Sequence, residues 1–152
     1  MYKIEKFILN IGVINLYTCV VKKYWMIGVI YLRIAVPAEG KTMESEVCQS
    51  FGRTYYFVVV DSETSEFTVI DNEAASSEGG AGIKAAQAVA DSGAGVVITF
   101  HCGKNAADVL KAANIKIMKA IPGTIADVVQ KYKAGELNEL SEIHAGYHKR
   151  GG

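Results

Sequence analysis

Short apolar runs alternate with helical patterns along most of the chain. Five runs are typical of β-strands, at residues 32–36, 55–61, 66–71, 95–99 and 115–119. The second and third runs are separated by four polar residues, which predicts an antiparallel hairpin. The first run is expected to end at Pro37, because proline has no amide hydrogen to donate to a sheet.

Three segments show the helical spacing of apolar residues. The predicted helices cover residues 83–92 and 105–113, and a last helix begins after the capping residue Thr124 and ends at Gly135. Long loops rich in small or polar residues are expected at 38–53 and 72–82. A hairpin followed by alternating helices and strands predicts an α/β fold, a mixed sheet of about five strands with helices packed on it.

The composition bounds the size and the partners of this fold. With 152 residues, half of them apolar, the chain is long enough for one domain with a proper core. The formal net charge is zero, but residues 1–31 hold four lysines and one glutamate, which leaves 12 basic and 15 acidic side chains in the remainder. This acidic body argues against nucleic acid as a partner.

Residues 1–31 differ from the rest of the chain. Their apolar stretch at residues 7–21 is short for a membrane span and fits a secretory signal poorly, so we expect no membrane insertion. We interpret the segment as translated upstream DNA, with the natural protein beginning at Leu32, because the start codon TTG encodes leucine inside a longer frame. Residues 28–30, Gly-Val-Ile, match what a ribosome-binding stretch would encode.

The cysteines are few and odd in number. Cys19, Cys48 and Cys102 make a poor disulfide framework and indicate a reducing cytoplasm. Cys102 and His101 lie where a strand run ends and a helix begins, and backbone amides at a helix start favour thiolates and anions. If the first and fourth strands are neighbours, Cys48 should reach the same edge of the sheet.

Several motifs occur in a familiar order along residues 32–134. They are Ala-Val-Pro at 35–37, Ser-Phe-Gly-Arg-Thr-Tyr-Tyr-Phe at 50–57, Val-Val-Val-Asp at 58–61, Gly-Gly-Ala-Gly at 79–82, Cys-Gly-Lys-Asn-Ala at 102–106, and Ala-Ala-Asn-Ile-Lys-Ile at 112–117. In this order and spacing they resemble the dinitrogenase iron-molybdenum cofactor biosynthesis family.

The resemblance implies a ribonuclease-H-like fold and a role in nitrogen fixation. The expected function is binding or carriage of an iron-sulfur cluster or an iron-molybdenum cofactor precursor, with cofactor-assembly proteins as partners. Two positions depart from the pattern. Ser50 stands where many relatives have histidine, and Lys104 stands where many have proline.

Four residues are the candidate ligands. We predict that Cys48 and Cys102 bind the metal, with His101 and Arg53 as supporting cofactor-binding residues. Two cysteines cannot complete a four-thiolate site, so a histidine, a ligand carried by the cofactor, or a second subunit must help, and bridging by a homodimer is expected. The alternative is a metal-free interaction or regulatory module with structural cysteines.

Enzyme activity is not expected. A nucleophile pair of Cys102 and His101 lacks an orienting third group, and adjacent residues seldom reach the necessary geometry. A nuclease of the ribonuclease H type would need clustered carboxylates on the central strands, but the runs at 32–36 and 95–99 carry none. The predicted organisation is an extension at 1–31, a cofactor-family domain at 32–135, and a flexible tail at 136–152.

Overall fold

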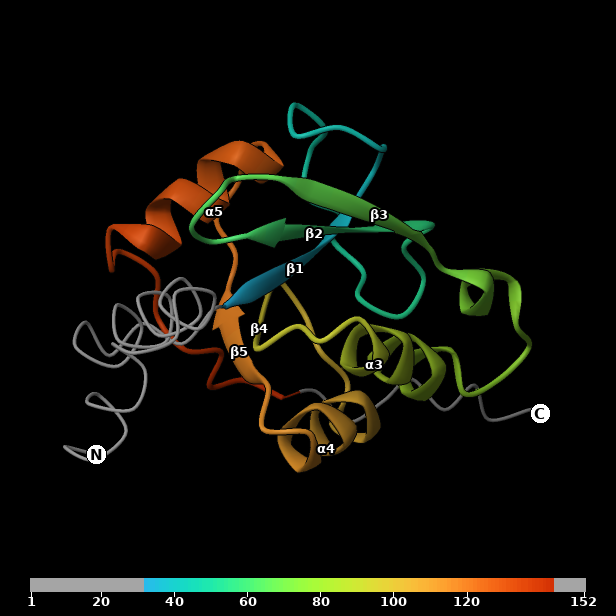
Figure 1. Ribbon diagram of the computed structural model, residues 1–152. Helices are drawn as coiled ribbons and strands as arrows, with labels where there is room; N and C mark the ends of the chain where they lie inside the picture. Colours follow the sequence, from blue (N-terminus) through green and yellow to red (C-terminus); the bar gives the residue numbers. More distant parts are fainter. Residues whose placement is uncertain (1–31, 144–152) are drawn as a thin grey trace, which may run out of the picture. The chain divides into compact units, whose positions relative to one another are not determined.

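A computed structural model describes residues 32–143 of the chain (Figure 1). The predictions for residues 1–31, including Cys19, and for residues 144–152 lie outside the described residues. No helix in the described part is long and apolar enough to cross a membrane.

The predicted strands and helices are all present, with ends within two residues of the expected ones. In chain order the elements are β1 (Arg33–Ala38), β2 (Tyr56–Asp61), β3 (Phe67–Asp71), η1 (Glu73–Ser76), α3 (Ala81–Asp91), β4 (Val96–Thr99), α4 (Lys104–Ala112), β5 (Lys116–Lys119) and α5 (Ile125–Lys133). The short 3-10 helix η1 was not predicted, and it occupies part of the loop expected at 72–82.

The first strand does not end at Pro37, and that prediction was wrong. β1 continues to Ala38, and Pro37 is paired with Phe57 of β2. The Pro37 carbonyl accepts a hydrogen bond from the Cys48 amide, so it faces away from β2. On that side β4 pairs only as far as Ala35, and the missing amide hydrogen of Pro37 therefore costs no hydrogen bond of the sheet.

The five strands form one mixed sheet in the order β3-β2-β1-β4-β5. β2 is antiparallel to both β1 and β3, whereas β1, β4 and β5 are parallel. The first and fourth strands are therefore neighbours, which was the condition for placing the loops that follow them at one edge. The mixed α/β architecture predicted from the sequence is confirmed.

Helices cover both faces of the sheet and enclose two apolar cores. Figure 1 shows α3 and α4 on one side of the sheet and α5 on the other. The first core joins Ala86, Val89 and Leu110 of α3 and α4 to the sheet, and the second joins Ile125 and Val128 of α5 to it. A strand that is buried on both faces is apolar at consecutive positions, because both its faces contact a core. Val-Val-Val at 58–60 in β2 is an example.

The chain stays packed against the sheet past Gly135, in the first residues of the segment predicted as a tail. Leu137 and Leu140 are buried. The Lys119 amide donates to the Asn138 carbonyl at 2.8 Å, and the Leu140 amide donates to the Ile117 carbonyl at 3.0 Å. Residues 138–140 thus pair with the outer side of β5, and Leu137 and Leu140 each enter one of the two apolar cores.

Candidate functional site

The candidate site lies at the edge of the sheet where the parallel strands β1 and β4 end. The loop at residues 39–55 follows β1 there, and residues 100–103 follow β4. Loops outside the carboxyl ends of adjacent parallel strands are the usual ligand-binding region of such sheets. This edge also receives the N-termini of the helices that lead into β4 and out of it.

The N-termini of α3 and α4 lie side by side, and small residues permit this. A Cβ atom built on Gly82 would lie 3.4 Å from the Ala106 Cβ atom. On its other side Gly82 is in contact with the 51–53 loop, since a Cβ atom on Gly52 would come within 3.0 Å of the Gly82 Cα and amide nitrogen. Three backbone segments therefore approach one another closely.

Neither of these two helices has a capping side chain. The N-cap residues are Gly80 for α3 and Gly103 for α4. In contrast, α5 is closed by a capping box in which the Thr124 hydroxyl accepts from the Asp127 amide and the Asp127 carboxylate accepts from the Thr124 amide. Uncapped amides and the helix dipole both favour an anion, so the paired starts of α3 and α4 suit an anionic ligand.

Cys102 lies directly before the Gly103 N-cap, but its thiol points into the first core. The residue is 1% exposed, and the sulfur lies 3.6 Å from the Gly103 carbonyl oxygen, to which it donates. Burial raises the pKa of the Cys102 thiol to about 11, although the charge of Lys111 acts in the opposite direction. The position beside a helix start therefore does not by itself produce a thiolate in the unliganded protein.

Cys48 lies in the loop after β1 and is half-buried. Its amide donates to the Pro37 carbonyl at 2.8 Å, and the preceding Val47 belongs to the second core. Burial also raises the pKa of the Cys48 thiol, opposed by hydrogen bonds from the Ser50 backbone and the Thr54 hydroxyl. Cys48 is therefore the more accessible thiol of the two.

Arg53 and His101 differ in how they are held. The Arg53 guanidinium donates to the Ala75 carbonyl at 3.1 Å and to the Ser77 carbonyl at 2.6 Å, so it ties the 51–53 loop to the segment that leads into α3. His101 is exposed, and its carbonyl accepts from the Thr99 hydroxyl at 3.2 Å. Arg53 thus shapes the edge, and His101 is presented to solvent beside it.

Both cysteines in the described part of the chain are free thiols. Cys102 lies in the core under α3 and α4, whereas Cys48 lies in a loop that contributes Val47 to the core under α5 and Phe51 to the core of Cys102. Within residues 32–143 no group of three or more His, Cys, Asp or Glu side chains is arranged to hold a metal ion. The protein's own side chains therefore do not form a closed metal site here.

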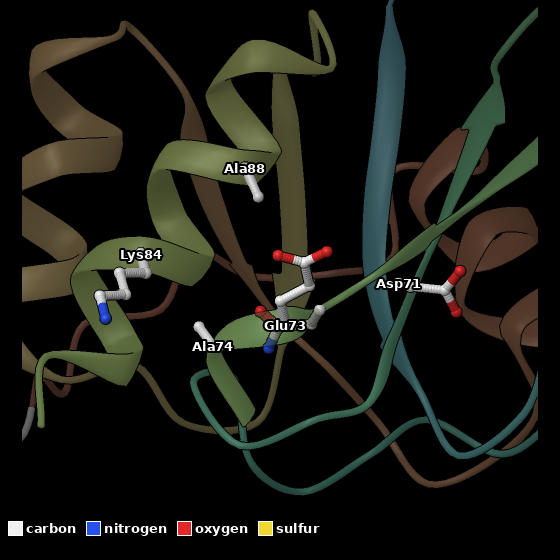
Figure 2. Close-up of a pocket in the computed structure, with 6 residues that line it drawn as sticks. Asp71, Glu73, Ala74, Lys84 and Ala88 are labelled. Carbon is white, nitrogen blue, oxygen red and sulfur yellow. The ribbon is translucent and has the colours of Figure 1, made fainter. Parts of the chain in front are cut away.

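A separate pocket opens between η1 and α3. Its volume is about 380 Å³, and it is lined by Asp71, Asn72, Glu73, Ala74, Lys84 and Ala88 (Figure 2). None of the four candidate ligands lines it. The side-chain amide of Asn72 donates hydrogen bonds to the Gly52 and Thr54 carbonyls. The wall of the pocket is therefore joined to the loop of the candidate site.

Of the two uncapped helix starts, only the start of α4 was predicted from the sequence, as the helix after Cys102. The start of α3 was missed, because the Gly-Gly-Ala-Gly run at 79–82 was assigned to a loop. The absence of Ser, Thr, Asp or Asn directly before either helix was the available signal, since these are the residues that normally cap helices.

Thiol chemistry gives a direct check on this geometry. At pH 8 we expect iodoacetamide to alkylate Cys48 well before Cys102, because a pKa of about 11 leaves roughly one Cys102 thiol in a thousand ionised. The rate at Cys102 should rise as the pH approaches that pKa. Mass mapping of the labelled peptides measures each site separately, and the urea-unfolded chain is the control. Alkylation of Cys102 as fast in the folded as in the unfolded chain would contradict this burial.

Comparisons with known proteins agree on one family. A family model described as dinitrogenase iron-molybdenum cofactor matches residues 32–135. No curated protein matches the chain.

Solved structures of similar proteins share the fold. The apo form of the orange protein from Desulfovibrio gigas is 38% identical, with a TM-score of 0.71 over 74% of this chain and 95% of that one. A protein from Thermotoga with a provisional NifB assignment is 32% identical, with a TM-score of 0.66 over 74% and 96%. A Methanocaldococcus jannaschii protein provisionally assigned as a dinitrogenase is 17% identical with a TM-score of 0.56, which supports the fold alone.

Proposed function

Because this chain belongs to the dinitrogenase iron-molybdenum cofactor family, we propose that it binds or carries an iron-sulfur cluster or an iron-molybdenum cofactor precursor. The cluster is cargo rather than a reactant, so the proposed role is carriage without turnover. The proposed setting is the cytoplasm, where cofactor-assembly proteins would deliver or receive the cluster.

The observation that carries this proposal is the pair of uncapped helix starts. Gly82 and Ala106 bring the N-termini of α3 and α4 together, and Gly80 and Gly103 leave their first amides without a capping side chain. Metal-sulfur clusters are commonly anionic, and hydrogen bonds from amides to their sulfur atoms stabilise them. An edge that presents amides suits such a cluster better than it suits a bare metal cation.

The proposed ligands are Cys102 and Cys48, with support from His101 and Arg53. Binding through Cys102 requires its thiol to lose a proton and to turn out of the core, and a bound metal favours that loss strongly. Because the described side chains do not complete a metal site, the remaining ligands would come from a histidine, from the cluster itself or from a second subunit. Arg53 supports this cargo indirectly, by holding the 51–53 loop against the start of α3.

The strand order supports the ribonuclease-H-like label. In the order β3-β2-β1-β4-β5 only β2 runs against the other strands, and such a mixed sheet is compatible with the fold that the resemblance implies. We therefore propose that the domain has a ribonuclease-H-like fold. It carries no implication of nuclease activity.

Anaerobic loading tests the function. The full chain is incubated with iron and sulfide in one series and with tetrathiomolybdate in another, desalted, and examined by absorption spectroscopy and metal analysis. We expect bound metal with charge-transfer bands in at least one series. Absence of retained metal and bands in both would refute carriage, whatever the ligands are.

Substitution then tests the ligands. Cys102→Ala should lower the metal retained at least tenfold, and Cys48→Ala should shift the charge-transfer bands, because each removes a thiolate from the metal. Ser92→Ala, at the far end of α3, is the matched control. Identical spectra for wild type and Cys102→Ala would remove the ligand assignment and would favour the alternative, in which the cysteines are structural.

A further inference from the structure

β3 forms one margin of the sheet and β5 forms the other (Figure 1). The two margins differ. Residues 138–140 pair with the outer side of β5, as described above. Nothing in the stretch from residue 32 to residue 143 pairs with the outer side of β3. As far as residues 32–143 show, the sheet therefore has one closed edge and one open edge.

The hydrogen bonds at the two ends of β3 show which of its backbone groups face outward. The Asp61 amide donates to the Glu66 carbonyl at 2.8 Å, and the Asn72 amide donates to the Tyr55 carbonyl at 2.8 Å. Residues 66 and 72 thus face β2, and alternation assigns residues 68 and 70 to the same side. The amide and carbonyl groups of residues 67, 69 and 71 consequently face outward.

This open edge lacks the features that normally prevent strand pairing. Exposed edges are usually protected by lysine, proline or a bulge, and the β3 sequence Phe-Thr-Val-Ile-Asp contains neither of these residues. Its one charge, on Asp71, is paired with Lys41 at 3.3 Å. Phe67 is 42% exposed, so the edge also has apolar surface to bury.

We propose that the occupant of this edge is a second copy of this chain, which pairs through its own β3 about a two-fold axis. Antiparallel pairing with Phe67 opposite the partner's Val69 lets the outward groups exchange four backbone hydrogen bonds. The same register sets Thr68 opposite the partner's Thr68. Cross-strand pairs of an aromatic with a β-branched residue, and of threonine with threonine, are favourable.

Charge complementarity supports a second copy rather than an unrelated strand. The Asp71 side chain is 70% exposed, and Figure 2 shows it pointing away from α3. In the proposed register Asp71 lies beside the hairpin turn of the partner. Lys133 Nζ is held at that turn by donation to the Ser65 hydroxyl at 3.2 Å. Asp71, which also contacts Lys41 of its own chain, therefore faces the partner's Lys133, and the two-fold axis repeats this contact.

Cross-linking tests the register. Thr68 lies on the axis in a pair without mutual hydrogen bonds, for which the Cα atoms are about 4.5 Å apart, within the range of a disulfide. Under mild oxidation we expect Thr68→Cys to give a reducible covalent dimer of the full chain. Gln87→Cys, exposed on α3, and the wild type measure the background from other cysteines. Cross-linking no greater than this background would overturn the proposal.

Sedimentation of the full chain without cross-linking measures whether it dimerises in solution. Concentrations of 1–200 µM cover about two decades, in which dimers with micromolar dissociation constants form and dissociate. We expect a monomer–dimer equilibrium that Phe67→Lys weakens tenfold or more. Ile83→Lys, which changes an apolar residue of similar exposure on α3, should leave it unaltered. A monomer throughout, or a dimer indifferent to Phe67→Lys, would overturn the proposal.

The double change Asp71→Lys with Lys133→Glu should associate more tightly than either single change, and the opposite order would refute the charge pairing.

Discussion

Truncation of Phe57 to alanine is expected to cost the domain about 3–5 kcal/mol of unfolding free energy. Phe57 is 0% exposed, and its ring lies 5.2 Å from the ring of Phe51, between centroids. The substitution removes apolar area from the core under α3 and α4 and leaves a cavity that a β-strand cannot close by shifting. Because small domains are stable by about 5–15 kcal/mol, this one change would consume a large share of the total.

Equilibrium unfolding in urea measures this loss, provided that the slope of the transition is unchanged. Tyr55→Ala is the matched control, because Tyr55 is an aromatic residue two positions away and is 70% exposed. Its loss should cost about 0.5 kcal/mol or less. Similar midpoints for the two variants would contradict the placement of Phe57 in the core.

Addition of one methyl group at Gly52 is expected to cost about 1–3 kcal/mol, by overpacking. The new Cβ atom in Gly52→Ala would lie 3.0 Å from the Cα and the amide nitrogen of Gly82. Both are backbone atoms, and Ala106 lies against the other side of Gly82, so neither can retreat. Under the proposed function, the same change should lower retention of the cluster, because it separates the loop from the start of α3.

Gly79→Ala is the control for this experiment. No atom lies within 4 Å of a Cβ built at Gly79, and its backbone is not in the left-handed region. The substitution should therefore be neutral or slightly stabilising, since alanine restricts the unfolded chain. If Gly52→Ala and Gly79→Ala have equal unfolding midpoints, the close contact at Gly52 is wrong.

Most of the fold could be predicted because its local signals agree with one another. The runs that became β2 and β4 are apolar up to their last residues, Asp61 and Thr99, and Thr124 is a residue type that commonly caps helices and does form a capping box. Pro37 was misjudged because the cost of proline depends on which neighbour its amide would face. That neighbour is known only once the sheet is assembled.

The candidate site was less predictable, for a related reason. Sequence spacing placed Cys102 at a helix start, but the direction of its thiol depends on how α4 packs against α3 and the sheet. Arg53 was predicted as a cofactor-binding residue because a guanidinium can pair with an anionic ligand. Its bonds to the Ala75 and Ser77 carbonyls depend on η1, an element of four residues that has no strong sequence signal.

The short segment that covers β5 bears on how far self-association could proceed. With residues 138–140 in place, the described part of each molecule offers one open strand, so the proposed pairing through β3 would stop at two copies. A chain cut at residue 135, where the family match ends, would carry two open strands. Such a chain could add molecules at both margins, and end-to-end polymers would replace a closed pair.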